Sequence, residues 1–327
     1  MTNYKDYIIM RKRITLFLAA FFSLAAFAQT DVKVICGNLV NSNGSVPVGI
    51  YAIPLTSDDF QVLPVVINPE IKADNGGTIV NGQFHFVNRN SDRQYLYHKF
   101  DMNTWQRIGE PEVIESDFKV GDMAYDESEN RLWAYFDEEW PNGIHTYSRF
   151  GYADADTKEV TILREGDQIK REMMAVCIGP DNEVYAMDPL SRIWKVDKTT
   201  GEPTVFLRLG MKYWIGEGHY SETRYAMTYD DEANCFYITL IPNDDLRSLL
   251  VSVDVATGEV KEIGEFQHDE EFGALWITTL STADIQNVAD GNNNSDQTVF
   301  DLQGSCISAQ NAKSGLYINN GKKVIVK

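Results

Sequence analysis

The chain has 327 residues and a formal net charge of −19, with 24% charged and 43% hydrophobic residues. An acidic surface of this size repels phosphate backbones and anionic lipid headgroups, so the composition disfavours nucleic acid and anionic membranes as partners. Three of the four cysteines, Cys36, Cys177 and Cys235, lie in apolar strand-like runs without a Cys-x-x-Cys pair, and we expect buried free thiols there.

The N-terminus has the pattern of a secretory signal peptide. Arg11, Lys12 and Arg13 precede an apolar run from 14 to 27, and Ala26-Phe27-Ala28 is typical of a cleavage site. The run is shorter than the roughly 20 residues that a spanning helix needs, although an uncleaved anchor is the alternative. We therefore assign residues 1–28 as a signal peptide and expect an exported protein, in the periplasm, on the cell surface or secreted. Residues 1–28 carry a net charge of +3, so the mature chain would carry −22 and no membrane span.

The rest of the chain repeats a strand–turn–strand phrase. Apolar runs flank Asn, Asp or Gly turns in the segments 123–135, 175–186 and 227–238, and in a looser copy at 77–87. Two short apolar runs joined across such a turn predict a β-hairpin.

A second phrase follows each hairpin. It is an Asp-x-x-Thr turn, present as Asp101–Thr104, Asp154–Thr157, Asp197–Thr200 and Asp254–Thr257. The Asp side chain of such a turn accepts hydrogen bonds from amides further along the chain. Apolar alternation after the turn predicts another strand, so each unit has four strands.

Four strands repeated about every 50 residues indicate a propeller blade. First strands are predicted near Thr78, Gly121, Met173, Tyr225 and Gly273. The last of them lacks partners, which the N-terminal runs 34–40, 48–55 and 60–67 supply. We predict an all-β fold: a five-bladed β-propeller over residues 29–280, closed by N-terminal strands that join the last blade, plus a short β-hairpin tail. A β-sandwich is the rival, but it does not predict the recurring Asp-x-x-Thr turn.

These phrases resemble extracytoplasmic β-propellers of the WD-repeat-like and quinoprotein-like kind across residues 32–280. A polar linker, 281–297, leads to a tail, 298–327, that ends in Gly315–Lys327. That tail resembles a truncated form of the type IX sorting domains of exported Bacteroidetes proteins. The resemblance implies a Bacteroidetes-type source and a secretion address, whereas a plain hairpin without an address is the alternative.

Motifs of known chemistry are absent from the sequence. The five histidines form no His-Glu-x-x-His or other close pair, and no phosphate or dinucleotide loop occurs. We expect no cofactor and no metal site. Some five-bladed propellers are glycosidases, which need two carboxyls about 5–10 Å apart. Glu172, Glu217 and Glu271 are the candidates for that carbohydrate-active alternative, although we favour a protein that is not an enzyme.

The loops that enter the first strands should surround one mouth of the central channel. The fourth of these loops, 210–224, is the longest and combines aromatic, histidine and charged residues, which suits ligand contact. We predict a binding module for a small molecule, glycan or protein, acting as a monomer; a protein-interaction scaffold is a further alternative. The candidate ligand-binding residues are Trp214, Glu217, His219, Tyr220, Arg224, Arg171, Glu172 and Glu271.

Overall fold

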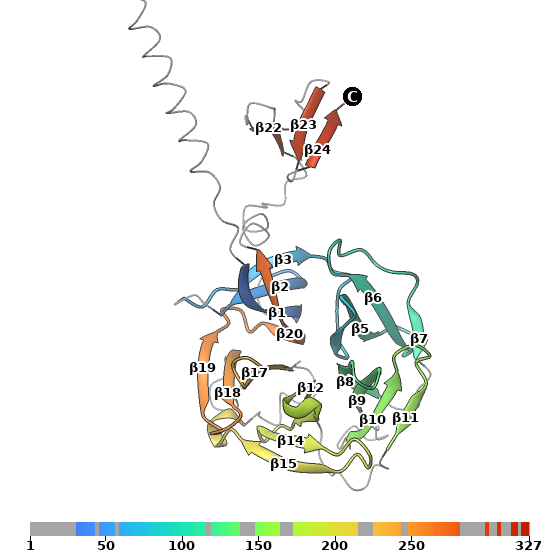
Figure 1. Ribbon diagram of the computed structural model, residues 1–327, viewed down its shortest axis with the longest axis vertical. Helices are drawn as coiled ribbons and strands as arrows, with labels where there is room; N and C mark the ends of the chain where they lie inside the picture. Colours follow the sequence, from blue (N-terminus) through green and yellow to red (C-terminus); the bar gives the residue numbers. More distant parts are fainter. Residues whose placement is uncertain are drawn as a thin grey trace, which may run out of the picture. The chain divides into compact units, whose positions relative to one another are not determined.

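The structure, a computed structural model, describes residues 31–42, 46–55, 59–114, 119–137, 148–163, 173–214, 225–242, 248–281, 298–300, 306–308, 315–319 and 322–326. The chain divides into two compact units, residues 1–285 and 286–327. The first unit is a ring of five four-stranded antiparallel sheets, a five-bladed β-propeller, as predicted (Figure 1).

The blades follow one another along the chain. Blade 1 is β4 (Gly77–Val80), β5 (Gln83–Arg89), β6 (Tyr95–Asp101) and β7 (Glu112–Ile114). Blade 2 is β8 (Lys119–Asp126), β9 (Arg131–Asp137), β10 (Ser148–Asp154) and β11 (Val160–Ile162). Blade 3 is β12 (Ala175–Ile178), β13 (Val184–Met187), β14 (Arg192–Val196) and β15 (Pro203–Arg208). Blade 4 is β16 (Ala226–Asp230), β17 (Cys235–Leu240), β18 (Leu249–Asp254) and β19 (Val260–Glu265).

Blade 5 closes the ring with strands from both ends of the first unit. Its order is β20 (Glu271–Ser281), β1 (Asp31–Asn41), β2 (Gly49–Pro54) and β3 (Leu63–Ile67). β1 pairs antiparallel with β20 along most of its length, with Cys36 opposite Trp276. Closure by the N-terminal strands is therefore confirmed, and it removes the open edges that an unclosed ring of sheets would expose.

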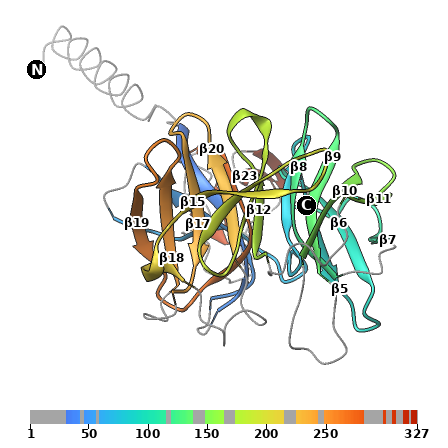
Figure 2. The same cartoon turned by 90° about the horizontal axis from the view of Figure 1, so that it is seen from below.

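The hydrophobic core is divided among the blade interfaces. Buried apolar side chains of the described residues form five clusters, and each one fills the contact between two neighbouring blades. Alternation along a strand explains this division, since Val34 faces blade 1 whereas Ile35 faces blade 4. Figure 2 shows blade 1 and blade 4 standing on opposite sides of the ring. Burial of each large side chain stabilises the ring by about 1.5–3 kcal/mol.

The Asp-x-x-Thr turns link the third and fourth strands of blades 1 to 4. In all four copies the Asp Oδ1 accepts hydrogen bonds from the amide and the hydroxyl of the Thr, as in Asp197 and Thr200 at 2.7 and 2.9 Å. These bonds hold the pKa of each Asp below its ordinary value. The repeated sequence phrase is thus one repeated turn geometry.

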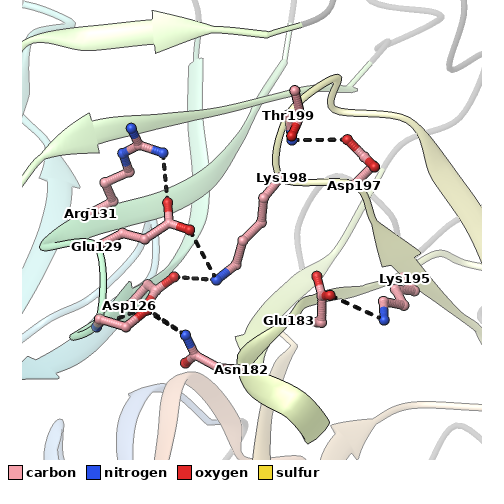
Figure 3. A network of polar contacts seen from close by, with 10 residues as sticks. Asp126, Glu129, Arg131, Asn182, Glu183, Lys195, Asp197, Lys198 and Thr199 are labelled. Carbon is pink, nitrogen blue, oxygen red and sulfur yellow. Dashed lines mark hydrogen bonds and ion pairs between the residues drawn. The ribbon is translucent and has the colours of Figure 1, made fainter.

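Polar contacts also join neighbouring blades. Asp126, buried at the end of β8, pairs with Lys198 of blade 3 and accepts a hydrogen bond from Asn182 of blade 3 at 3.0 Å (Figure 3). Asp230, at the end of β16, pairs in the same way with Lys33 of blade 5 at 2.7 Å. The two aspartates end the equivalent first strands of blades 2 and 4, and each pairs with a lysine of the next blade.

The second unit has a four-stranded sheet in the order β22 (Cys306–Ser308), β21 (Thr298–Phe300), β23 (Gly315–Asn319) and β24 (Lys322–Val326). β23 and β24 form the expected hairpin, which two further strands extend. In the described ranges of the chain, no helix is long and apolar enough to cross a membrane. Cys36, Cys177 and Cys235 are buried free thiols, as predicted.

Candidate functional site

The fourth entry loop begins with a turn that only glycine adopts readily. Gly210 has φ 96° and ψ 167°, a backbone region that a side chain disfavours. The chain then forms the short 3-10 helix η2 (Met211–Tyr213) and reaches Trp214, which has an extended backbone. Met211 is 72% exposed and Trp214 38% exposed. Large apolar side chains with this exposure, next to each other, are available for contact with a ligand.

Polar contacts on both sides hold η2 in place. The Ser191 hydroxyl donates to the backbone oxygen of Tyr213, and the Leu209 amide donates to the backbone oxygen of Ser191 at 3.0 Å. On the other side, Lys212 pairs with Glu262 of β19, to which the Tyr213 hydroxyl also donates at 3.3 Å. η2 is therefore anchored to blade 3 and to blade 4, which positions the indole that follows it.

A polar cluster joins the loop between β13 and β14 to the start of β14. Asp188 is fully buried. Its Oδ2 accepts hydrogen bonds from Nε of Arg192 at 2.7 Å, from Nη2 of Arg192, and from Nε1 of Trp194 at 3.0 Å. The Arg192 guanidinium lies over the Trp194 ring, 4.7 Å from its centroid. A two-point pair of this kind fixes the plane of the guanidinium.

A cavity of about 170 Å³ lies between these two features. Its lining residues are Leu190, Arg192, Arg208, Gly210, Met211 and Trp214. The pocket combines an exposed indole, an apolar wall and two guanidinium groups, so it can contact an apolar face and an anionic group together. We call it the Trp214 pocket.

A second cavity, of about 150 Å³, occupies the central channel. It is lined by the innermost strands of all five blades, at residues 77–79, 122–125, 176–178, 227–228 and 274–276. Asp122 is the only carboxylate among the described residues that line this cavity, whereas glycosidase chemistry needs two.

The structure describes two of the eight residues proposed from the sequence. Trp214 lines the pocket named after it. Glu271 is buried at the start of β20, inside the strand instead of before it, and accepts a hydrogen bond from Asn41 at 3.2 Å. Glu271 lines neither of the two cavities, so the structure does not bring Trp214 and Glu271 together in one site. Glu217, His219, Tyr220, Arg224, Arg171 and Glu172 lie outside the described residues.

Sequence reasoning missed the polar half of the pocket. Asp188, Arg192 and Arg208 belong to blade 3, outside the aromatic-rich entry loop that the sequence pattern singles out. The one available signal was an Asp, an Arg and a Trp at 188, 192 and 194 around a tight turn. Among the described residues, no group of three or more His, Cys, Asp or Glu side chains is arranged to hold a metal ion.

No family model and no curated protein matches the chain. Several solved structures do. TolB from Acinetobacter baumannii is 11% identical with a TM-score of 0.44, and the match covers 73% of this chain and 54% of the TolB chain. A structural genomics protein of unknown function from Bacteroides thetaiotaomicron is 17% identical with a TM-score of 0.42, over 73% of this chain and 66% of that one.

A chain of a nidogen/laminin complex is 11% identical with a TM-score of 0.41, over 75% of this chain and 98% of that one. This chain thus matches only about half the length of TolB. Matches at these levels say nothing about ligand or activity. The chain itself, by its own strand order, is a five-bladed β-propeller.

Proposed function

We propose that this protein is an exported propeller that binds a small ligand in the Trp214 pocket, on the side where loops enter the first strands. One observation carries the proposal. An exposed indole is held beside a cavity by contacts that fix the turn before it, instead of packing into the core. A pre-positioned aromatic wall with a few polar groups is the usual composition of a ligand site.

A melting-temperature screen of the purified protein against glycans, carboxylic acids and peptides tests this function. A ligand that binds only the folded state raises the midpoint, by a stabilisation of about 2.7 kcal/mol at a hundredfold excess over its dissociation constant. We expect Trp214→Ala to abolish the shift while the midpoint of the free protein changes little, because the indole is partly exposed.

Phe206→Ala is the matched control. Phe206 is also an exposed aromatic residue of blade 3, and it contacts Tyr185 but does not line the Trp214 pocket. A ligand shift that survives Trp214→Ala, or that Phe206→Ala removes equally well, would place the ligand elsewhere and end the pocket proposal.

Export is the second part of the proposal, and it rests on the basic and apolar N-terminal pattern of residues 11–28. The tail, residues 298–327, would then act as a sorting address in a Bacteroidetes-type host. Cell fractionation and N-terminal sequencing of the full chain, with and without the tail, test both. Export predicts a mature N-terminus at residue 29. An address predicts that loss of the tail retains the protein inside the outer membrane.

A further inference from the structure

The Trp214 pocket carries positive charge in a strongly acidic protein. The side chain of Arg208 has no hydrogen bond or ion pair within the described part of the chain, and Arg208 is an exposed residue of the pocket wall. The acid that touches the lining, Asp188, is already paired with Arg192. This pair is neutral as a unit, so Arg208 leaves the described lining with one uncompensated cation.

The hydrogen-bonding groups of the pocket suit a carboxylate. Arg192 uses Nε and Nη2 on Asp188, and among the described residues its Nη1 has no partner. Arg208 presents its whole planar fork. Guanidinium groups bind carboxylates by two parallel N–H···O bonds, which a neutral hydroxyl cannot match.

The rest of the lining suits a ring. The exposed residues Trp214 and Met211 line the cavity together with Leu190. A flat apolar face stacks on an indole with little loss of freedom. A volume of about 170 Å³ holds one six-membered ring, whereas pockets for drug-sized ligands take roughly 300–1,000 Å³.

We infer that the Trp214 pocket selects a ligand whose ring carries a carboxylate, with Arg208 as the residue that determines specificity for the charge. This inference rests on the proposed function and narrows it. The ring stacks on Trp214 while the carboxylate faces Arg208 and Nη1 of Arg192. The ring can be a sugar or an aromatic one, since both offer an apolar face.

Isothermal titration calorimetry with two matched pairs tests the charge selection: glucuronate against glucose, and benzoate against benzyl alcohol. We expect the charged member of at least one pair to bind about tenfold tighter or more than the neutral member. Raising the salt concentration should weaken the charged member alone. The pair that responds identifies the ring type.

Arg208→Gln should remove this preference, so that the charged and the neutral member of each pair bind about equally. Lys195→Gln is the matched control, because it removes a partly exposed cation of blade 3 that does not line the pocket. It should leave the preference intact. A preference that survives Arg208→Gln overturns the inference, as does equal binding of both members or no binding of either carboxylate.

These failures are distinguishable from failure of the proposed function. Equal binding that Trp214→Ala abolishes keeps the pocket and removes only the charge selection. Charged members that bind with full preference in Trp214→Ala place the carboxylate site elsewhere, and both proposals fall. Silence of all four probes overturns the carboxylate inference, while the wider ligand screen decides on the pocket.

Discussion

The Asp122 carboxylate accepts the backbone amide of Val176 at 2.8 Å, and so links the first strand of blade 2 to the first strand of blade 3. A register shift between Val120 and Met123 forms a bulge that contains Asp122. The same carboxylate accepts the amides of Met123 and of Gly77 in blade 1. The first strand of each blade has no neighbouring strand on its channel side, so some of its amides lack a partner in a sheet. Asp122 accepts hydrogen bonds from such amides of blades 1, 2 and 3.

We expect Asp122→Asn to lower the free energy of unfolding by about 1–3 kcal/mol at pH 5, because one amide loses its acceptor. Burial raises the pKa of Asp122 to about 8, against the opposing effect of the three amides. Because the folded pKa lies above the unfolded one, the stabilisation is fully present below the unfolded value of about 3.8 and is lost progressively as the pH rises from there to 8. Denaturant unfolding at pH 5, 7 and 9 should show the gap between wild type and variant shrinking. A gap that widens with pH would mean that Asp122 is ionised in the fold.

The pair of Lys198 and Asp126 should contribute more to stability than an exposed pair on the same blade. Burial opposes ionisation of Asp126, but hydrogen bonds from Lys198, Ser128 and Asn182 outweigh it and hold its pKa below the ordinary value. Lys198→Met leaves a buried carboxylate without its cation, and we expect a loss of about 1–3 kcal/mol.

Lys195→Met is the control for this prediction. Lys195 pairs with Glu183 at 3.3 Å, with both side chains about one-third exposed (Figure 3). Exposed pairs contribute less than about 1 kcal/mol. Equal losses in urea unfolding of the two variants would show that burial of the inter-blade pair has no energetic consequence.

His85 should make the fold sensitive to acid. Its Nε2 lies 3.0 Å from Oε1 of Gln83 and its Nδ1 faces the Tyr97 hydroxyl, contacts that a neutral ring with its proton on Nε2 satisfies. Burial, with Lys99 and Lys158 nearby, lowers the pKa of His85 to about 4. A lowered histidine pKa stabilises the fold above the unfolded value near 6.5, and the contribution is lost as the pH falls towards 4.

We expect wild type to lose about 2–3 kcal/mol through His85 between pH 7 and 4.5. His85→Gln should remove that part of the loss. The loss that is due to His98, whose pKa burial also lowers to about 4, should remain in this variant. Unfolding curves at the two pH values check this. An unchanged acid loss in His85→Gln would show that the ring is already charged in the folded protein.

Gly210→Ala should damage the Trp214 pocket through the backbone alone. A Cβ on Gly210 meets no atom within 4 Å, yet φ is +96°. We expect a cost of about 1–3 kcal/mol and weaker ligand binding, because η2 and Trp214 follow directly. Gly82→Asn is the control, since Gly82 has φ +76° in a hairpin turn where asparagine is tolerated. Unchanged ligand affinity in Gly210→Ala would show that binding in the Trp214 pocket does not depend on the conformation of this turn.

The blade repeat was predictable because each unit carries its own turn chemistry. Asp197 and Thr200, like their three counterparts, are near in sequence and bond to each other, so a local phrase reports a local structure. Closure by β1 and β20 followed from counting strands that lacked partners.

The Trp214 pocket could be predicted only in part. Trp214 stood out because an aromatic-rich loop is visible in the sequence, whereas Arg208 looks like any charged residue at the end of an alternating strand. Asp122 was missed for a different reason. Asp122 lies in a bulge, which reverses the alternation that predicts where a strand residue points. The register of strand pairing, and hence the bulge, cannot be derived from composition.

Closure of blade 5 also has a consequence for timing. Among the propeller strands, β1 is the first to be synthesised and pairs with β20, which is the last, so Val34 can pair with Thr278 only after the rest of the ring has been made. Until then the edge of β1 stays open, and pairing over such a separation is slow. A chain truncated before residue 271 would lack β20 and could not close the ring. Its β1 would keep an unpaired edge, which is prone to aggregation. The pairing of β1 with β20 therefore forms only in a chain whose propeller has been synthesised completely.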